Sequence, residues 1–289
     1  MRDFSLDVMK LFLQELKKRD YRFQSVLDFM QHPISKTIIL RHDVDRKALC
    51  AWRMACIEAE MGIRGTYYFR IVPAAYNEKI IKAIADLGHE IGYHYEDLAL
   101  ANGNWELGIQ SFERNLEKLR RIAPVKTICM HGSPLSKFDN RLLWQKFDYR
   151  KYAIIGEPYL DIDFADVLYL TDTGRRWDGD GVSIRDKAST STEHRAWGME
   201  RNRQSAAHYA PCSMRHALRF RETFDIITAL ERGLLPKKIM LTIHPQRWHD
   251  RFIPWAKELV WQNGKNVVKA VVVKRRNGVM EQWSDGVVE

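Results

Sequence analysis

Four short, mostly apolar runs in this sequence stop abruptly at aspartate or histidine. The runs, each with the polar residues that follow it, are 37–40 with Asp43 and Asp45, 90–93 with His94, 125–130 with His131, and 238–243 with His244. Such runs are typical of buried strands in a parallel sheet. Parallel sheets carry their functional side chains at the carboxyl ends of the strands, which lie side by side. The sequence therefore predicts one polar site assembled from distant parts of the chain.

Segments with helical periodicity separate these runs. Leu6, Met9, Leu13 and Leu16 recur at helical spacing, which predicts a helix up to about residue 18. Further helices are predicted over 47–61, 77–87, 105–122, 141–147, 220–232 and 254–274, and further strands over 65–72, 152–155 and 167–170, while 21–30 forms a less regular element. This alternation predicts an α/β fold in which crossover helices join parallel strands.

A single domain is expected over residues 1–289. No repeat or linker divides the chain, and its length lies within the range of one α/β barrel. Residues 1–35 are expected to contribute helices that precede the first strand of the site. Residues 187–212 are poor in aliphatic side chains, so we expect a long excursion over one face, of the kind that serves as a lid or binding loop.

The charge balance favours anionic partners only mildly. Lysine and arginine number 46 against 37 acidic residues, for a net charge of +9. No arginine-rich run interleaved with aromatic residues accompanies this excess, so a nucleic-acid partner is not expected. The sequence leaves the oligomeric state open.

The N-terminal segment has the pattern of neither a signal peptide nor a membrane span, because charged residues interrupt its apolar stretches. We therefore expect a cytoplasmic protein with reduced thiols and no stable membrane insertion. The basic stretch 255–276 could rest on an anionic membrane surface. The preferred interpretation is a helix that packs on the body of the protein.

Aspartate and histidine converging at one edge of a sheet are typical of a catalytic metal site. Such a site offers oxygen and nitrogen ligands and keeps one position for water. Mixed ligation of this kind fits zinc best and also suits cobalt, nickel, manganese or iron. The chemistry expected of the metal is activation of water and polarisation of a carbonyl group.

The motifs resemble those of the polysaccharide deacetylases of the NodB-homology type, carbohydrate esterase family four. The matching segments are Leu-Arg-His-Asp-Val-Asp at 40–45, Gly-His-Glu-Ile-Gly-Tyr-His at 88–94 and Leu-Thr-Ile-His-Pro at 241–245. They look most like a cytoplasmic branch found near O-antigen and capsule sugar genes. The resemblance implies a distorted seven-stranded (β/α) barrel.

The same resemblance implies roles for individual residues. Asp43 would be the general base, Asp45 and His94 would bind the metal, and His244 would protonate the leaving amine. The family usually has a second histidine four residues after His94, where this chain has Leu98. Two residues remain as the third ligand, Glu96 in the same loop and His131 in the third motif, where the family usually has arginine. His131 is preferred, because it follows a strand that points at the same centre.

Substrate-binding roles are predicted for four further residues: Asp172, Trp177, Arg41 and Tyr95. The first two correspond to an acid and a tryptophan of the family's fourth motif, which shape the acetyl pocket and hold the catalytic histidine. Arg41 lies within the first matching segment, and Tyr95 directly follows the second. His89, which opens the second motif, is expected to be a buried structural histidine.

The function implied is metal-dependent removal of an N-acetyl group from an acetamido sugar. The expected substrate is a nucleotide-linked or lipid-linked precursor of O-antigen or capsule, whose phosphates suit the positive net charge. Two alternatives stay open. The first is another metal-dependent amide hydrolase, for example one acting on cyclic ureides, and the second is a sugar-binding protein that has lost its metal and its activity.

Overall fold

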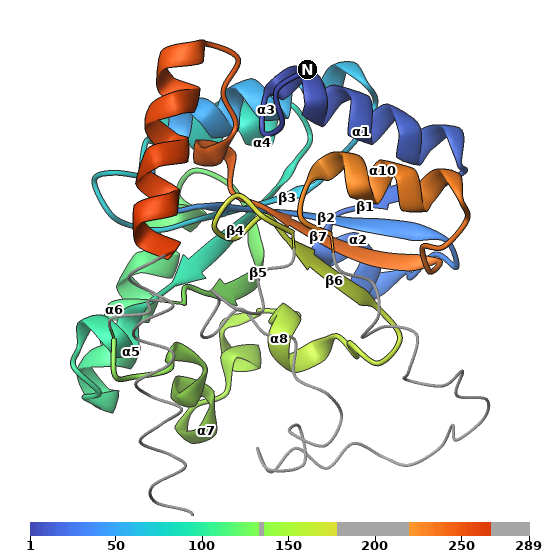
Figure 1. Ribbon diagram of the computed structural model, residues 1–289. Helices are drawn as coiled ribbons and strands as arrows, with labels where there is room; N and C mark the ends of the chain where they lie inside the picture. The colour runs from blue at the N-terminus through green and yellow to red at the C-terminus, as the bar shows by residue number, and fades with distance from the viewer. Residues whose placement is uncertain (133–135, 178–219, 267–289) are drawn as a thin grey trace, which may run out of the picture.

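The computed structural model describes residues 1–132, 136–177 and 220–266 (Figure 1). The predicted excursion over 187–212 lies outside these residues, as does the end of the predicted last helix after residue 266.

A parallel sheet of seven strands forms the centre of the molecule. The strands are β1 (Arg22–Gln24), β2 (Thr37–Val44), β3 (Thr66–Phe69), β4 (Glu90–Tyr95), β5 (Val125–Met130), β6 (Leu168–Thr171) and β7 (Lys238–Ile243). The order is β5-β4-β3-β2-β7-β6, with β1 also paired to β2, and every pair is parallel. The predicted α/β class is therefore confirmed. No pairing joins β5 to β6 in the described ranges, so closure into a barrel is not shown.

Seven strands were predicted and seven are present, but one of them, β1, was not among those predicted. β1 pairs with the first residues of β2, Thr37 to Ile39, and lies within the segment expected to be irregular. The strand predicted over 152–155 is absent: a 3-10 helix ends at Tyr152, Ala153 adopts a left-handed φ of 54°, and only an isolated bridge follows, between Thr127 and Gly156. Segments this short carry too little periodicity to be read from sequence.

The helices are α1 (Leu6–Lys18), α2 (Val26–Gln31), α3 (Ala48–Glu60), α4 (Glu78–Asp86), α5 (Asp97–Leu100), α6 (Trp105–Arg120), α7 (Leu143–Lys146), α8 (Pro158–Asp161), α10 (Thr223–Glu231) and a helix over 252–266. Ser5, Asn77 and Asn104 cap α1, α4 and α6, each accepting a hydrogen bond from a backbone N–H of the first turn. Figure 1 shows α1, α3, α4 and α10 above the sheet, with α5, α7 and α8 below it.

Alternation along β2 decides which residues reach the site. All eight residues of β2 are buried. Ile38 and Leu40 pack in the core that includes α1 and α10, while Ile39 packs in the core on the other face. Because side chains alternate along a strand, Arg41 and Asp43 lie on the face of Ile39. β2 also runs further than predicted, since Arg41 to Val44 pair with β3.

Candidate metal centre at the carboxyl edge of the sheet

Three predicted metal ligands meet at the ends of three strands. Asp45 follows β2, His94 lies near the end of β4, and His131 follows β5. Asp45 Oδ1 is 3.6 Å from His94 Nε2 and 3.6 Å from His131 Nε2. Among the described residues, these three form a group whose ligand atoms are close enough to hold one metal ion.

Both histidines of this triad are oriented with Nε2 toward Asp45. His94 Nδ1 lies 2.9 Å from the carbonyl oxygen of Cys129, and His131 Nδ1 lies 3.0 Å from Glu96 Oε2. A carbonyl oxygen and a carboxylate can only accept, so Nδ1 carries the hydrogen in each ring. The lone pair of the neutral imidazole is then on Nε2, the tautomer that binds a metal.

The donor set and its spacing fit a divalent cation. Asp45 Oδ1 is buried and has no hydrogen-bond partner among the described residues, whereas Oδ2 accepts from Gln246 Nε2 at 3.1 Å. A buried carboxylate oxygen without a donor is costly, and a cation would remove that cost. Ligand atoms about 2.1 Å from a tetrahedral zinc lie about 3.4 Å apart, close to the separations in the triad.

The electrostatics hold His94 and Asp45 in the protonation states that metal binding needs. Burial lowers the pKa of His94 to about 4, so its imidazole is neutral near pH 7. Burial alone would raise the pKa of Asp45, but the surrounding imidazoles outweigh it and the pKa is lowered. Burial alone would lower the pKa of His131, but the hydrogen bond with Glu96 outweighs burial, so the pKa is raised. The same hydrogen bond makes the His131 ring a stronger electron-pair donor to a metal.

Asp43 lies beside the triad in a fixed orientation. Its two carboxylate oxygens accept from Arg41 Nε at 2.8 Å and Nη2 at 2.7 Å, and Oδ2 is 3.7 Å from His94 Nε2. Burial would raise the pKa of Asp43, but Arg41 and His94 lower it to about 2, so the group is ionised. Arg41 is completely buried, so what it contacts is the Asp43 carboxylate rather than solvent.

His244 approaches the triad from β7, the strand paired to β2. Its Nε2 is 4.0 Å from Asp45 Oδ2, and its Nδ1 is 2.6 Å from Asp172 Oδ1. Asp172 is fully buried and also accepts from the backbone N–H of His244 at 3.0 Å and from Trp248 Nε1 at 2.8 Å. Asp172 therefore fixes the ring of His244, which is one of the two roles predicted for it.

Two predicted substrate-binding residues lie away from the cluster. Tyr95 is on the opposite face of β4 from His94, and its ring packs against Trp144 with centroids 5.5 Å apart. Trp177 packs among aromatic side chains on the α1 side, with Nε1 donating to Thr223 Oγ1 at 3.0 Å. Tyr95 directly follows His94, so strand alternation already predicts that the two side chains face opposite ways.

Glu96, the alternative third ligand, supports the triad from outside. Arg70 donates to its two carboxylate oxygens at 2.8 and 2.7 Å, and His131 donates to Oε2. Arg70 is a site residue that the sequence pattern does not reveal, because it falls inside the strand predicted over 65–72. In the structure it follows β3 directly, so it too is a polar residue at a strand end.

His89 lies outside the cluster, in a buried position behind β3. Its Nδ1 accepts from the backbone N–H of Gly65 at 3.2 Å, and its Nε2 lies 3.0 Å from the carbonyl oxygen of Ala55 on α3. Both ring nitrogens are thus used in joining a helix to a strand.

Comparisons with family models, with curated proteins and with solved structures found no match. What the site can do is therefore inferred from its own residues.

Proposed function

We propose that this protein is a metal-dependent hydrolase that removes an N-acetyl group from an acetamido sugar. The observation that carries the proposal is the arrangement of the triad, in which Nε2 of His94 and of His131 face the unpartnered Oδ1 of Asp45. An ionised carboxylate, Asp43, and an oriented imidazole, His244, flank that centre. Hydrolysis of an amide needs such a base and such an acid.

Asp45, His94 and His131 would hold the cation, with zinc the first choice and cobalt, nickel, manganese or iron as alternatives. When bound, the metal would supply Lewis-acid chemistry, lowering the pKa of water and polarising the acetyl oxygen. Glu96 and the carbonyl of Cys129 would keep both imidazoles in the ligand orientation.

Asp43 would serve as the general base. Its low pKa keeps it ionised, and its bidentate contact with Arg41 holds Oδ2 toward the triad. The carboxylate would take a proton from the attacking water as the water oxygen bonds to the acetyl carbon. The positive charge of Arg41 weakens Asp43 as a base, and in exchange it fixes the direction of proton transfer.

His244 would serve as the general acid. Asp172 Oδ1 lies 2.6 Å from Nδ1 and holds the ring in place, while Nε2, on the other side of the ring, faces the centre. As the C–N bond breaks, His244 would give its proton to the amine nitrogen. The products would be acetate and the free amino sugar, with one water consumed.

The resemblance of residues 40–45, 88–94 and 241–245 to the deacetylase motifs supports this assignment, and on that basis we further propose the distorted seven-stranded (β/α) barrel of that family as the architecture. We also propose a cytoplasmic substrate whose sugar is linked to a nucleotide or a lipid carrier in O-antigen or capsule synthesis. The phosphates of either carrier would suit the net charge of +9.

The test is release of acetate from acetylated sugars by the metal-loaded protein. Asp43→Asn should lower the rate about 10²- to 10⁴-fold, the usual contribution of a general base, and leave stoichiometric metal in the protein. The matched control is Asp86→Asn on α4, which changes an exposed aspartate paired only with Lys82.

The outcomes separate the alternatives. Acetate release that survives in Asp43→Asn removes that residue from the mechanism. Ammonia release from small amides or cyclic ureides, without acetate from sugars, indicates a different amide hydrolase. A protein that binds sugars and takes up no stoichiometric transition metal is a binding protein, and the proposal is then wrong.

A further inference from the structure

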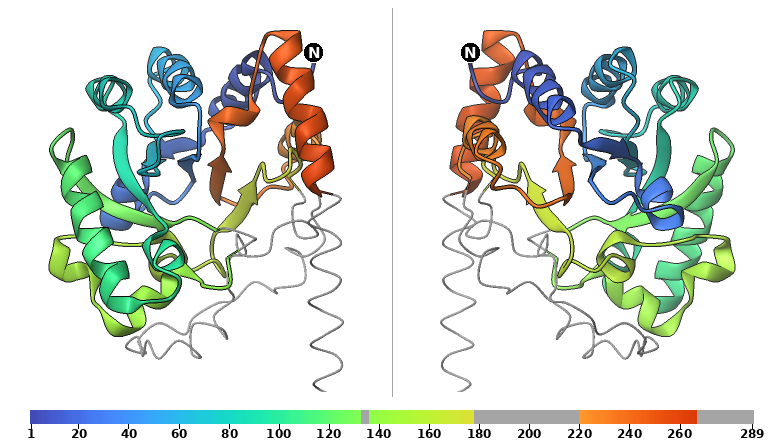
Figure 2. Two further views of the ribbon diagram at one scale, coloured as in Figure 1. Left: turned by 90° about the vertical axis from the view of Figure 1, so that its left-hand side faces the viewer. Right: turned by 90° about the vertical axis from the view of Figure 1, so that its right-hand side faces the viewer.

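The helix over residues 252–266 exposes an apolar face. Ile253 is 66% exposed, Val260 73% and Trp261 53%, and Phe252 in the same turn as Ile253 is 61% exposed. Positions seven and eight residues after Ile253 fall on the same side of a helix. The exposed apolar residues therefore form one stripe along the helix, which lies at the outer edge of the molecule (Figures 1 and 2).

Two polar residues of this helix, Glu258 and Gln262, are buried against the protein. Glu258 is only 3% exposed and accepts from Arg46 Nη2 at 2.6 Å and from Gln262 Nε2 at 2.8 Å, and Lys47 Nζ lies 3.4 Å away. A surface helix usually turns its apolar side to the core and its polar side to water. In this helix the inward side is mixed, with Glu258 and Gln262 buried and Leu259 half-buried, and packing on the protein does not account for Ile253, Val260 and Trp261.

The charges that accompany the apolar stripe are positive. Lys257 and Lys265 are exposed, and Lys265 Nζ lies 4.9 Å from the ring centre of Trp261. Glu258 is the one acid in residues 251–266, and its contact with Arg46 holds it inside. A helix with an exposed face of apolar, aromatic and lysine side chains is typical of peptides that lie in the surface of an anionic membrane.

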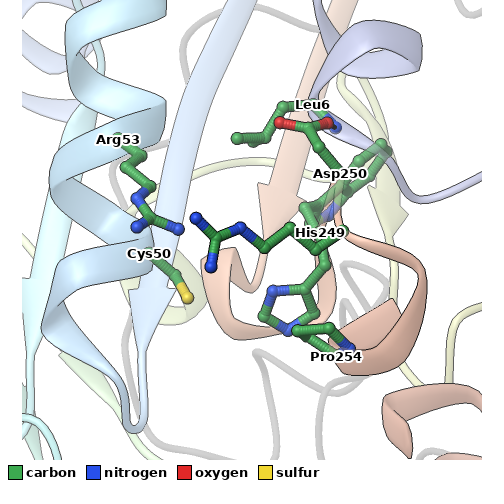
Figure 3. Close-up of a pocket in the computed structure, with 8 residues that line it drawn as sticks. Leu6, Cys50, Arg53, His249, Asp250 and Pro254 are labelled. Atoms are coloured by element: carbon green, nitrogen blue, oxygen red, sulfur yellow. Dashed lines mark hydrogen bonds between the residues drawn. The ribbon is translucent and has the colours of Figure 1, made fainter. Parts of the chain in front are cut away.

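A second feature beside the first turn of the helix also suits an anion. A pocket of about 260 Å³ lies between α3 and residues 248–254, with Arg53, Arg251, His249 and one acid, Asp250, in its lining. Figure 3 shows Arg53 and Cys50 extending from α3 on one side and His249 on the other. Neither guanidinium has an acidic partner within the described residues. The one acid of the lining, Asp250, accepts from the backbone N–H of Leu6 at 2.9 Å, and the two arginines outnumber it, which favours a phosphate group.

We propose that the helix over 252–266 and the adjoining pocket dock this protein on an anionic phospholipid surface. Phe252, Ile253, Val260 and Trp261 would enter the boundary between head groups and acyl chains, and Lys257, Lys265, Arg53 and Arg251 would contact lipid phosphates. Attachment would be peripheral, because none of the described helices is long and apolar enough to cross a bilayer. The docking does not depend on the proposed hydrolysis.

The position of the helix relates the membrane to the metal centre. Arg46, which binds Glu258 of the helix, directly follows Asp45 of the triad. Docking would therefore bring the metal centre close to the head-group layer. A sugar carried on a membrane lipid would reach the centre more readily than one dissolved in the cytoplasm.

The test is co-sedimentation of the full-length chain with vesicles of phosphatidylcholine, with and without phosphatidylglycerol. Binding is expected only to the anionic vesicles and should weaken as salt is raised. The double variant Val260→Glu/Trp261→Glu should lower the apparent affinity about tenfold or more. Arg53→Gln/Arg251→Gln should lower it on anionic vesicles as well.

The matched control is Leu100→Glu/Leu107→Glu, which adds the same two charges at exposed leucines of α5 and α6. These helices lie well apart from residues 252–266 in Figure 2. The control should bind like the unaltered protein, and circular dichroism should show both double variants folded. Equal vesicle binding by Val260→Glu/Trp261→Glu, or no binding by the unaltered chain, overturns the proposal.

Two further results would assign the face to another occupant and also overturn the proposal. Dimers of the unaltered protein without lipid, lost in Val260→Glu/Trp261→Glu, would identify a second copy of this chain. Vesicle binding that appears only after removal of residues 267–289 would identify that segment as the one that packs on the apolar face of the helix over 252–266.

Discussion

At the scale of single residues, three members of the candidate site are each held in place by a buried charged residue. Arg41 holds Asp43, Asp172 holds His244, and Glu96 holds His131. Each supporting group is buried, so its partner has little freedom to rotate. Arg41 and Asp43 are two residues apart on one strand, and strand alternation alone places them on the same face. The contact of Asp172 with His244 was expected from the family resemblance alone, whereas the contact of Glu96 with His131 joins distant segments and could not be read from the sequence.

The support of His131 by Glu96 leads to a prediction about metal affinity. Glu96→Gln keeps an oxygen that can accept from His131 Nδ1 and removes the negative charge that strengthens the ring as a donor. We expect the affinity for zinc or cobalt to fall about 10- to 100-fold, measured by competition with a fluorescent chelator. Glu106→Gln, at an exposed glutamate of α6, is the control. A loss as large as that of His131→Ala would mean that Glu96 is itself a ligand.

At the scale of elements, the side chains of β2 and β4 point alternately to two buried faces of the sheet, and only one of these faces carries the site. In β2, Arg41 and Asp43 face the site, while His42 faces α3 and lies 2.8 Å from Glu58 Oε1. In β4, His94 faces the site together with Gly92, while Tyr93 packs on Phe112 of α6. A shift of one residue in the register of either strand would exchange these faces and remove the site.

The close approach of β4 to Tyr68 on β3 predicts the effect of adding one methyl group. A Cβ at Gly92 would lie 2.2 Å from Tyr68 Cε1 and 3.2 Å from the carbonyl oxygen of Thr127. Tyr68 is completely buried and its hydroxyl is 2.8 Å from Thr127 Oγ1, so the ring has little room to move. Gly92→Ala should lower the free energy of unfolding by about 1–3 kcal/mol, measured by urea denaturation.

The control for Gly92→Ala is the same change at Gly264 in the helix over 252–266, where nothing lies within 4 Å of the added Cβ. Gly264→Ala should leave stability unchanged or raise it by up to about 1 kcal/mol, because alanine favours a helix more than glycine does. A Gly92→Ala protein as stable as the unaltered chain would show that Tyr68 can move aside.

The attachment of the helix over 252–266 through Glu258 predicts a pH dependence. Burial would raise the pKa of Glu258, but the hydrogen bond from Gln262 and the charges of Arg46 and Lys47 outweigh it, so the pKa is lowered. A carboxyl whose pKa is lowered by folding stabilises the protein above the pKa of the unfolded chain, about 4.3, and loses this effect as the pH falls through the folded value.

Glu258→Gln should therefore lower the free energy of unfolding by about 1–3 kcal/mol at pH 7, as measured by urea denaturation. The difference from the unaltered protein should shrink steadily below about pH 4. Glu60→Gln, at an exposed position of α3, should cause no pH-dependent difference. A constant difference from pH 7 to pH 3 would contradict the role assigned to the ionised carboxylate.

At the scale of the whole molecule, the strand order brings the site together. β7 pairs with β2 although about 200 residues separate their ends, so His244 arrives beside Asp43 and Asp45. β4 and β5 supply His94 and His131 from the other side of β2, across β3. A metal ion bound by Asp45, His94 and His131 would connect β2, β4 and β5, which the chain joins only through long crossover segments.

This arrangement predicts that metal binding stabilises the whole fold. A ligand at 100 times its Kd adds about 2.7 kcal/mol to a folded protein that it binds selectively. For a chain of this size that corresponds to a rise in Tm of about 5–10 °C. Differential scanning fluorimetry should show the rise with zinc or cobalt, its reversal by a chelator and its loss in His131→Ala. His32→Ala, at an exposed histidine, should keep it. A Tm that is indifferent to metal would remove the triad as a cation site.

The sequence by itself determined the class of the fold and the residues gathered at its edge. Runs of apolar residues and helical spacing are local patterns, and the position of a polar residue at a strand end is local as well. The tertiary structure decided the pairing of strand β1, the absence of a strand at 152–155, and the direction in which Trp177 points. It also decided the role of Glu96 as a support for His131. These features depend on contacts between segments far apart in the chain, and no local pattern records which distant segments will pair.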